Sequence, residues 1–126
     1  MLFFKNFVLE RLCEFRVMES IPGKIKLKSN APESVYEQVA PYDRELKKAI
    51  SFLDEVEEVD VNYEMGTILI EYDARRTNER RIIDWIDTIV KIGLENKEEI
   101  SKYSSTDIEY LEELLEQQLK EQIGKF

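Results

Sequence analysis

The segment "EVDVNYEMGTILIEYD" at residues 58–73 constrains the fold more than any other part of the 126-residue sequence. Apolar and polar residues alternate on both sides of an interruption that runs from Asn62 to Gly66. A period of two is typical of β-strands, whose successive side chains point to opposite faces of a sheet. The segment therefore predicts two short strands joined by a tight connection. The alternating apolar residues are Val59, Val61, Ile68, Ile70 and Tyr72.

Two amphipathic helices are predicted on either side of this hairpin. Pro41 suits the first turn of a helix over residues 41–54, and Asn78 can cap a second helix over residues 78–95. The inward stripe of the first consists of Leu46, Ala49, Ile50 and Leu53. The broad apolar face of the second consists of Ile82, Ile83, Ile86, Ile89, Val90 and Leu94, and it is wide enough to be buried against a sheet. Residues 29–41, "SNAPESVYEQVAP", predict a loop with one helical turn.

The N-terminal part leaves two alternatives open. Residues 2–12 predict a short amphipathic helix, and residues 13–28 alternate with a period of two around Pro22-Gly23. This dipeptide either bends one long strand or reverses the chain in a type II turn. In the second case "EFRVMES" pairs antiparallel with "KIKLKS", and Phe15 and Val17 join Ile25 and Leu27 over the helices. In the first case an open strand edge is left for a partner or a second copy.

A further helix is predicted at the C-terminal end, over residues 104–124. Thr106 and Glu109 form a capping box. The apolar stripe that follows consists of Ile108, Leu111, Leu115, Leu119 and Ile123, and Gln118 and Gln122 interrupt any strict heptad pattern. The stripe fits either a helix docked on the domain or the seam of a homodimer. The order strand, helix, strand, strand, helix, helix predicts a two-layer α+β sandwich with the helices on one face of the sheet.

Two motifs in this order resemble the heavy-metal-associated (HMA) domain, in particular its second, cysteine-poor subtype, as in some metal-transporting P-type ATPases. "PGKIKLK" resembles the first strand of that subtype. "EVEEVDVNYEMGTILIEYD" resembles its hairpin, although Glu55 replaces a usual Gly and Met65 a common Thr. The matching residues are Pro22, Gly23, Lys24, Ile25, Val56, Val59, Val61, Asn62, Gly66, Thr67, Ile70, Tyr72 and Asp73.

The resemblance implies a ferredoxin-like fold, which in full runs βαββαβ. Here it would be βαββα with an extra C-terminal helix, because nothing after the second helix has the pattern of a strand. We therefore expect three parts: an amphipathic segment over residues 1–12, an HMA-like domain over residues 13–95 and a C-terminal helix over residues 104–124. In the full fold the last strand lies beside the first and antiparallel to it.

The metal chemistry of the family is not expected in this chain. Its metal-binding subtype places a Cys-x-x-Cys pair after the first strand, whereas this sequence has no His and a single cysteine, Cys13. Soft thiolate ligands select Cu(I) and Zn, so we predict no metal site and no cofactor. Cys13 lies in an apolar alternating pattern, which favours a buried, unreactive side chain over a ligand. No nucleophile with a nearby base and no phosphate-binding loop is present, so we predict that the protein is not an enzyme.

Three charged groups are candidates for recognition, each against the simpler interpretation of a solvated surface. The acidic run from Asp54 to Asp60 offers oxygen ligands for a hard ion such as Fe(II), Mn or Ca, but neighbouring side chains on a strand diverge. The run Arg75, Arg76, Arg80 and Arg81 surrounds a helix N-terminus, where anions bind. Lys24, Lys26 and Lys28 share one strand face and, with Leu111, Leu115 and Leu119, form the partner interface that we predict.

The function expected from the resemblance is that of an accessory protein in metal homeostasis. It would dock to a protein partner such as a metal-transporting P-type ATPase or a metal-storage assembly, with iron favoured because Cu and Zn ligands are absent. The alternative is a peripheral membrane or assembly adaptor that uses the Phe-rich residues 1–12, and a third hypothesis is a small-ligand sensor. With a net charge of -9 the chain is unsuited to nucleic acid. We expect a cytoplasmic protein, in contact with a membrane only through residues 1–12, that forms a homodimer if the C-terminal stripe is a seam.

Overall fold

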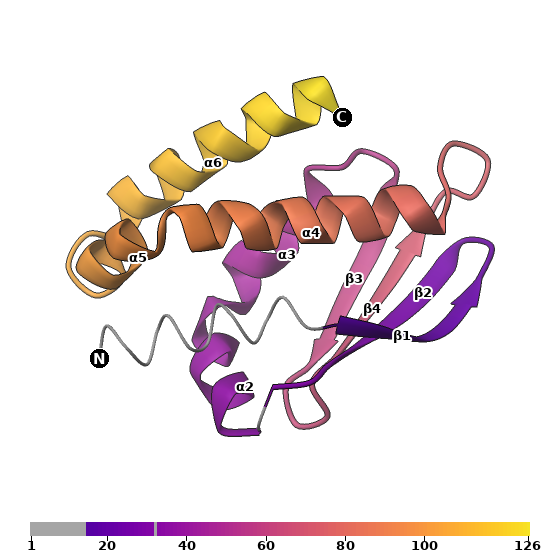
Figure 1. Ribbon diagram of the computed structural model, residues 1–126, viewed down its shortest axis with the longest axis horizontal. Helices are drawn as coiled ribbons and strands as arrows, with labels where there is room; N and C mark the ends of the chain where they lie inside the picture. The colour runs from indigo at the N-terminus through magenta and orange to yellow at the C-terminus, as the bar shows by residue number, and fades with distance from the viewer. Residues whose placement is uncertain (1–14, 32) are drawn as a thin grey trace.

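The chain folds into a four-stranded antiparallel sheet with its helices packed on one face (Figure 1). The computed structural model describes residues 15–31 and 33–126, so the segment 1–12 and Cys13 lie outside the described residues. The strands are β1 (Phe15–Ile21), β2 (Lys24–Ser29), β3 (Val56–Asn62) and β4 (Thr67–Tyr72). The α-helices are α2 (Glu33–Val39), α3 (Asp43–Ser51), α4 (Glu79–Glu95), α5 (Lys97–Tyr103) and α6 (Ile108–Lys125), and a 3₁₀ turn, η1 (Ala40–Tyr42), precedes α3.

The strand order β1-β2-β4-β3 confirms the ferredoxin-like α+β fold. From β2 to α4 the elements follow the family order, and β4 lies between β2 and β3, antiparallel to both. The place of the missing last strand, beside β2 and antiparallel to it, is taken by β1, which comes first in the chain. Of the two alternatives at Pro22-Gly23, the structure therefore shows the chain reversal.

The turn between β1 and β2 has the geometry that its two residues favour. Ile21 is paired with Lys24, so Pro22 and Gly23 are the two central residues. Gly23 has φ of 88°, the left-handed value that a type II turn requires at its second central position. A type II turn matches the twist of a hairpin poorly, and a β-bulge at Met18, between Val17 and Glu19, adds local twist to the same hairpin.

The core lies between the inner face of the sheet and helices α3 and α4. The buried strand residues are Ile25, Leu27, Ile68, Ile70 and Tyr72, and Phe15 packs against them as predicted. The expectation for Val17 is wrong in part. Val17 is paired with Leu27 and shares its sheet face, yet it is 43% exposed. As a residue of the outermost strand, Val17 has a neighbouring strand on one side only.

Trp85 of α4 connects the two central helices. Its side chain is fully buried, and its indole N–H donates to the carbonyl oxygens of Ala49 and Ile50 at 3.1 and 3.2 Å. These carbonyls belong to the last turn of α3, where they also accept from the backbone N–H groups of Phe52 and Leu53. One buried side chain therefore supplies apolar packing and a hydrogen bond to the end of α3. Asn78 begins α4 as predicted, since its side-chain oxygen accepts from the N–H of Arg81.

Three helix predictions need correction. Residues 33–39 form the seven-residue helix α2 where a loop with one helical turn was expected, and residues 97–103, for which no element was predicted, form α5. The cap of α6 is Asp107, whose carboxylate accepts from the N–H of Tyr110 at 3.1 Å. The Thr106 hydroxyl instead donates to the carbonyl of Lys102 at the end of α5, so it does not form the predicted capping box.

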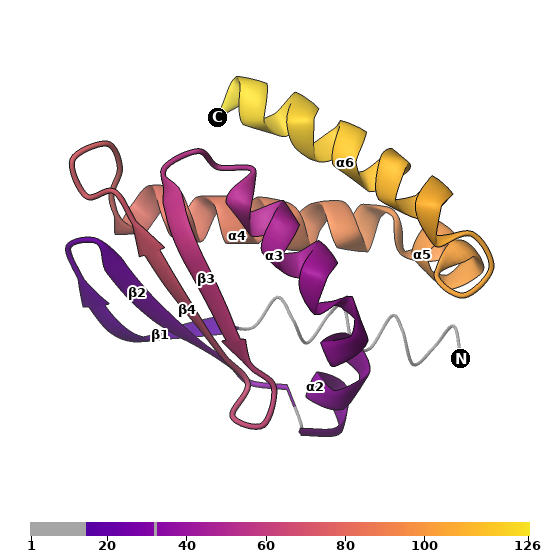
Figure 2. The same ribbon diagram turned by 180° about the vertical axis from the view of Figure 1, so that it is seen from behind.

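Helix α6 packs on α3 and α4 (Figure 2). Leu111 and Leu119 are buried, and Leu115 packs against the core from a half-buried position. Gln118 and Asn96, the residue that ends α4, exchange two hydrogen bonds of 2.8 and 3.0 Å through their side-chain amides. The first of the two alternatives for the apolar stripe, a helix docked on its own domain, is therefore the one observed.

We predict that Gly23→Ala destabilises the protein by about 1–2 kcal/mol, because a side chain disfavours the left-handed conformation. The added Cβ would also lie 3.3 Å from the carbonyl oxygen of Tyr72. Urea unfolding measures the loss of stability, and hydrogen exchange should show faster exchange of the β1 amides that bond to β2. The matched control is Gly124→Ala in α6, where a Cβ meets nothing within 4 Å and alanine should stabilise by up to about 1 kcal/mol. Equal stability of both variants would contradict the assignment of the turn.

Candidate functional site

The first candidate site is the end of β2 and the segment that follows it. In the metal-binding subtype of the HMA domain, which the sequence motifs resemble, the cysteine pair follows the first strand. In this chain the segment after β2 contributes a buried aromatic side chain. Tyr36 of α2 is buried, and its hydroxyl donates to the carbonyl oxygen of Ser29 at 2.9 Å. Together with Ala31 it forms a small second core, against which Val39 and Tyr63 pack.

Gly66 is required beneath the Tyr36 ring. A Cβ at residue 66 would lie 2.1 Å from Cζ of Tyr36, far inside contact distance, and Gly66 also has φ of 68°. The Gly66 carbonyl accepts from the N–H of Ser29 at 2.9 Å. The glycine of the hairpin motif therefore serves two purposes, since it permits both the turn and the close approach of the ring.

The polar groups around this ring are already bonded within the protein. The Lys28 ammonium donates to the carbonyl of Met65 and lies 5.7 Å from the centroid of the Tyr36 ring. The Asn62 side chain accepts from the backbone N–H groups of Glu64 and Met65, both at 3.0 Å. The Lys28 ammonium repels a cation, and the buried Tyr36 ring excludes one, so these residues do not fit a soft metal ion.

Tyr63 joins the β3–β4 turn to the start of α3. Its hydroxyl donates to Asp43 at 2.6 Å, and Lys47 forms an ion pair with the same carboxylate at 3.0 Å. The hydrogen bond from Tyr63 is the main reason that the pKa of Asp43 lies below its ordinary value. Burial, followed by the bond to Asp43, raises the pKa of Tyr63 well above its ordinary value.

The acidic run and the arginine run are brought together by the fold. Asp54 pairs with Arg76 at 2.6 Å, and Glu55 pairs with Arg81 at 3.1 Å. The remaining two arginines also have carboxylate partners, at 3.1 Å for Arg75–Asp73 and 3.2 Å for Arg80–Asp84. All four arginines and two of the five acidic residues, Asp54 and Glu55, thus have a partner of opposite charge, so the arginine run matches the simpler interpretation of a neutralised surface. Within residues 15–31 and 33–126, no group of three or more His, Cys, Asp or Glu residues could hold a metal ion.

The six residues predicted to form a partner interface fall on two different sides of the fold. Lys24, Lys26 and Lys28 alternate with the buried residues of β2 and therefore lie on the outer face of the sheet. Their partners on the neighbouring strand β4 are Glu71, Leu69 and Thr67, in that order. Leu111, Leu115 and Leu119 belong to α6, on the helical side. A contact of either group with a partner stays a prediction.

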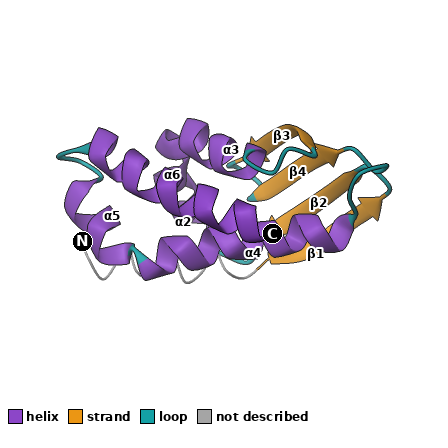
Figure 3. Cartoon of the chain, turned by 90° about the horizontal axis from the view of Figure 1, so that it is seen from above, coloured by secondary structure: helices purple, strands orange, loops and turns teal. Residues whose placement is uncertain are grey.

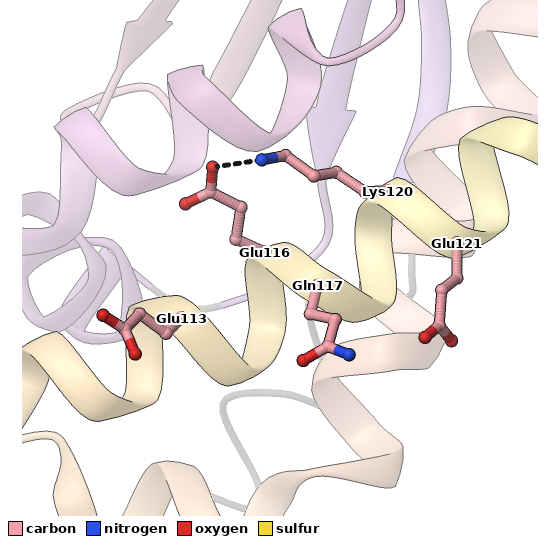
Figure 4. A pocket seen from close by; sticks show the side chains of 5 residues that line it. All are labelled: Glu113, Glu116, Gln117, Lys120 and Glu121. Atoms are coloured by element: carbon pink, nitrogen blue, oxygen red, sulfur yellow. Dashed lines mark ion pairs between the residues drawn. The ribbon is translucent and has the colours of Figure 1, made fainter.

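Two hollows lie on the helical side. Figure 4 shows the first, along α6, whose lining residues Glu113, Glu116, Gln117, Lys120 and Glu121 all come from that one helix. Glu116 pairs with Lys120 at 3.2 Å and with Lys48 of α3 at 3.3 Å, so its charge is already neutralised within the protein.

The second hollow is an apolar groove of about 400 Å³, which we call the helical groove. It is lined by residues of α3, α4, α5 and α6 and by Phe15. Sequence reasoning missed it, although the signal was present: the apolar face predicted for residues 78–95 is longer than a sheet of short strands can cover. Figure 3 shows the helices extending beyond the sheet.

Comparison with known families identifies the central part of the chain. Residues 43–91 match the model of the heavy-metal-associated domain, a stretch that covers α3, β3, β4 and most of α4. The chain thus contains an HMA-like domain, as the motifs predicted. The match begins after β2 and the loop that would hold the cysteine pair. No curated protein and no solved structure matches the chain. None of the helices in the described residues is long and apolar enough to cross a membrane.

We predict that Tyr63→Phe raises the pKa of Asp43 towards its ordinary value, because the main stabilising partner of the carboxylate is lost. A lowered folded-state pKa stabilises the protein above the unfolded-state value of 3.8, and this contribution disappears as the pH falls through the folded pKa. The difference in unfolding free energy between the wild type and Tyr63→Phe should therefore shrink as the pH falls below 3.8. NMR titration of the Asp43 carboxyl carbon measures the pKa. Tyr42→Phe, at an exposed position just before α3, is the matched control and should leave it unchanged.

Proposed function

We propose that this protein is a non-enzymatic accessory protein of metal homeostasis that acts by docking to a protein partner. The match to the heavy-metal-associated domain supports a role in metal binding or trafficking. The observation that most favours docking over metal carriage is that the segment after β2 carries no Cys and instead packs Tyr36 on Gly66. The partner that we propose is a metal-transporting P-type ATPase or a metal-storage assembly.

Iron is the metal that we propose for the pathway served by the partner. Copper and zinc favour thiolate or imidazole ligands, and the sequence contains one Cys and no His. The proposal concerns the partner's cargo, since the described residues hold no cluster suited to a metal. It places the protein in the cytoplasm, where such a partner would expose its soluble domains.

The outer face of the sheet is the docking surface that fits this role. Lys24, Lys26 and Lys28 lie in a row along β2, next to the outermost strand β1. Strand β1 also carries two exposed apolar side chains: Met18 is 48% exposed and Ile21 is 61% exposed. Glu71 and Glu19 lie opposite Lys24 and Lys26 on the neighbouring strands, so a partner surface with an apolar centre and acidic groups facing the lysine row fits this face.

We predict that the full chain binds neither Cu(I) nor Zn(II) at one equivalent with high affinity, because the described residues offer no convergent thiolates. Calorimetric titration of the reduced protein with each metal, and with Fe(II), provides the measurement. Cys13→Ser is the matched variant, and its titration curves should equal those of the wild type. Stoichiometric Cu(I) or Zn(II) binding that is lost in Cys13→Ser would show that the protein carries metal itself.

We predict that the soluble domains of the metal-transporting ATPase from the same source shift the amide signals of β2 in an NMR titration of the full chain. Lys24→Glu combined with Lys26→Glu should weaken the interaction at least about tenfold, since both substitutions place like charges opposite an acidic surface. Lys91→Glu combined with Lys97→Glu makes the same charge change on the helical side and should leave the affinity unchanged. Equal loss of affinity in both variants would assign the effect to net charge and refute a defined docking face.

A further inference from the structure

We propose that the N-terminal segment, residues 2–12, docks as an amphipathic helix into the helical groove. The groove is bounded by apolar side chains from three helices that are far apart in sequence. Leu46 comes from α3, Ile89 and Val90 come from α4, and Leu115 comes from α6. These four side chains are only half-buried, although the groove lies directly beside the core. A contiguous apolar surface of this kind requires a cover in water.

The path of the chain leads from the segment directly into the groove. Phe15 is the first residue of β1, and its side chain is part of the groove lining. Fourteen residues precede it, which would span roughly 20 Å as a helix. The N-terminal segment is thus tethered at the edge of the groove, so its effective concentration there is far above that of any free partner.

The apolar pattern of the segment fits a groove between helices. On a helix the large apolar residues Phe3, Phe4, Phe7 and Val8 lie on one side, which Arg11 shares. Lys5 and Asn6 lie on the other side, together with Leu2 and Leu9. Helix-in-groove recognition uses such a stripe, in which large side chains fill the space between the helices of the receptor.

The charge of the groove rim complements a basic residue of the segment. Glu45 of α3 and Glu112 of α6 both line the groove, and Glu45 is the main cause that raises the pKa of Glu112. Two carboxyl groups this close repel one another when both are ionised. Arg44 and Lys48 act in the opposite direction on the pKa of Glu112, and Arg11, next to the apolar side of the docked segment, would add a further positive charge at this rim.

A lipid surface suits the segment less well than the groove does. Residues 1–14 contain Lys5 and Arg11, but also Glu10 and Glu14, so their side chains carry no net positive charge. Interfacial helices bind anionic membranes through basic residues on the polar face, and the whole chain has a net charge of -9. The groove, in contrast, needs only the apolar stripe and one cation.

A spin label tests the proposal in the full chain. Cys13→Ser removes the native thiol, and Lys5→Cys then provides one attachment site on the polar side of the segment. We expect loss of the methyl signals of Ile89, Val90 and Leu115 in the NMR spectrum of the labelled protein. The signals should return when Phe3→Asp and Phe7→Asp are added, whereas Asn6→Asp, which adds one charge on the polar side, should leave them broadened.

Three results would overturn the proposal. The first is that the groove methyl signals keep their intensity in the labelled chain. The second is broadening that appears only when spin-labelled chains without isotope are mixed with isotope-labelled chains, which would make a second copy the occupant. The third is that phosphatidylcholine vesicles containing phosphatidylglycerol bind the chain and restore the signals, which would assign the segment to a lipid surface. Thermal melts of each variant establish that the domain is folded in every sample.

Discussion

The pairing of β1 with β2 is the interaction on which the rest of the structure depends. Without it β2 would be an outer strand with unpaired N–H and C=O groups, and the sheet would consist of three strands. Because β1 fills that place from the N-terminal side, the chain after α4 is not needed in the sheet. It forms α5 and α6 instead, and α6 covers α3 and α4. The helical groove exists because these helices extend beyond the strands.

Much of this fold could be predicted from periodicity and turn chemistry. The β3–β4 hairpin, the cap at Asn78 and the burial of Ile82 and Ile86 in α4 follow from local patterns that packing did not change. Trp85 and Ile92 are also buried, although neither belonged to the predicted apolar face. The helices α2 and α5 escaped prediction because each is seven residues long and polar along much of its length, which leaves almost no periodic signal. The exposure of Val17 also escaped, because alternation identifies the face of a strand but not its place at the edge of the sheet.

The candidate site was less predictable than the fold. The absence of a cysteine pair was evident from the sequence, whereas the burial of an aromatic side chain in the segment after β2 was not. Tyr36 contacts Gly66 across 30 positions of the chain, and only the completed sheet brings them together. The charged runs show the same limit. Asp54 and Arg76 were recognised as members of two separate clusters, but their ion pair forms because the α3–β3 turn lies beside the β4–α4 turn.

The exchange of the last strand for the first one alters the order in which the sheet can assemble. In a ferredoxin-like chain the final strand must wait for the whole domain before it finds its neighbour. Here every contact of β1 with β2 lies within residues 15–29, so the closure of a very short loop replaces a long-range search. Rates of folding rise as contacts become more local. During synthesis, this hairpin leaves the ribosome before helices α2 to α6, so the most exposed edge of β2 is already covered when the remaining strands arrive.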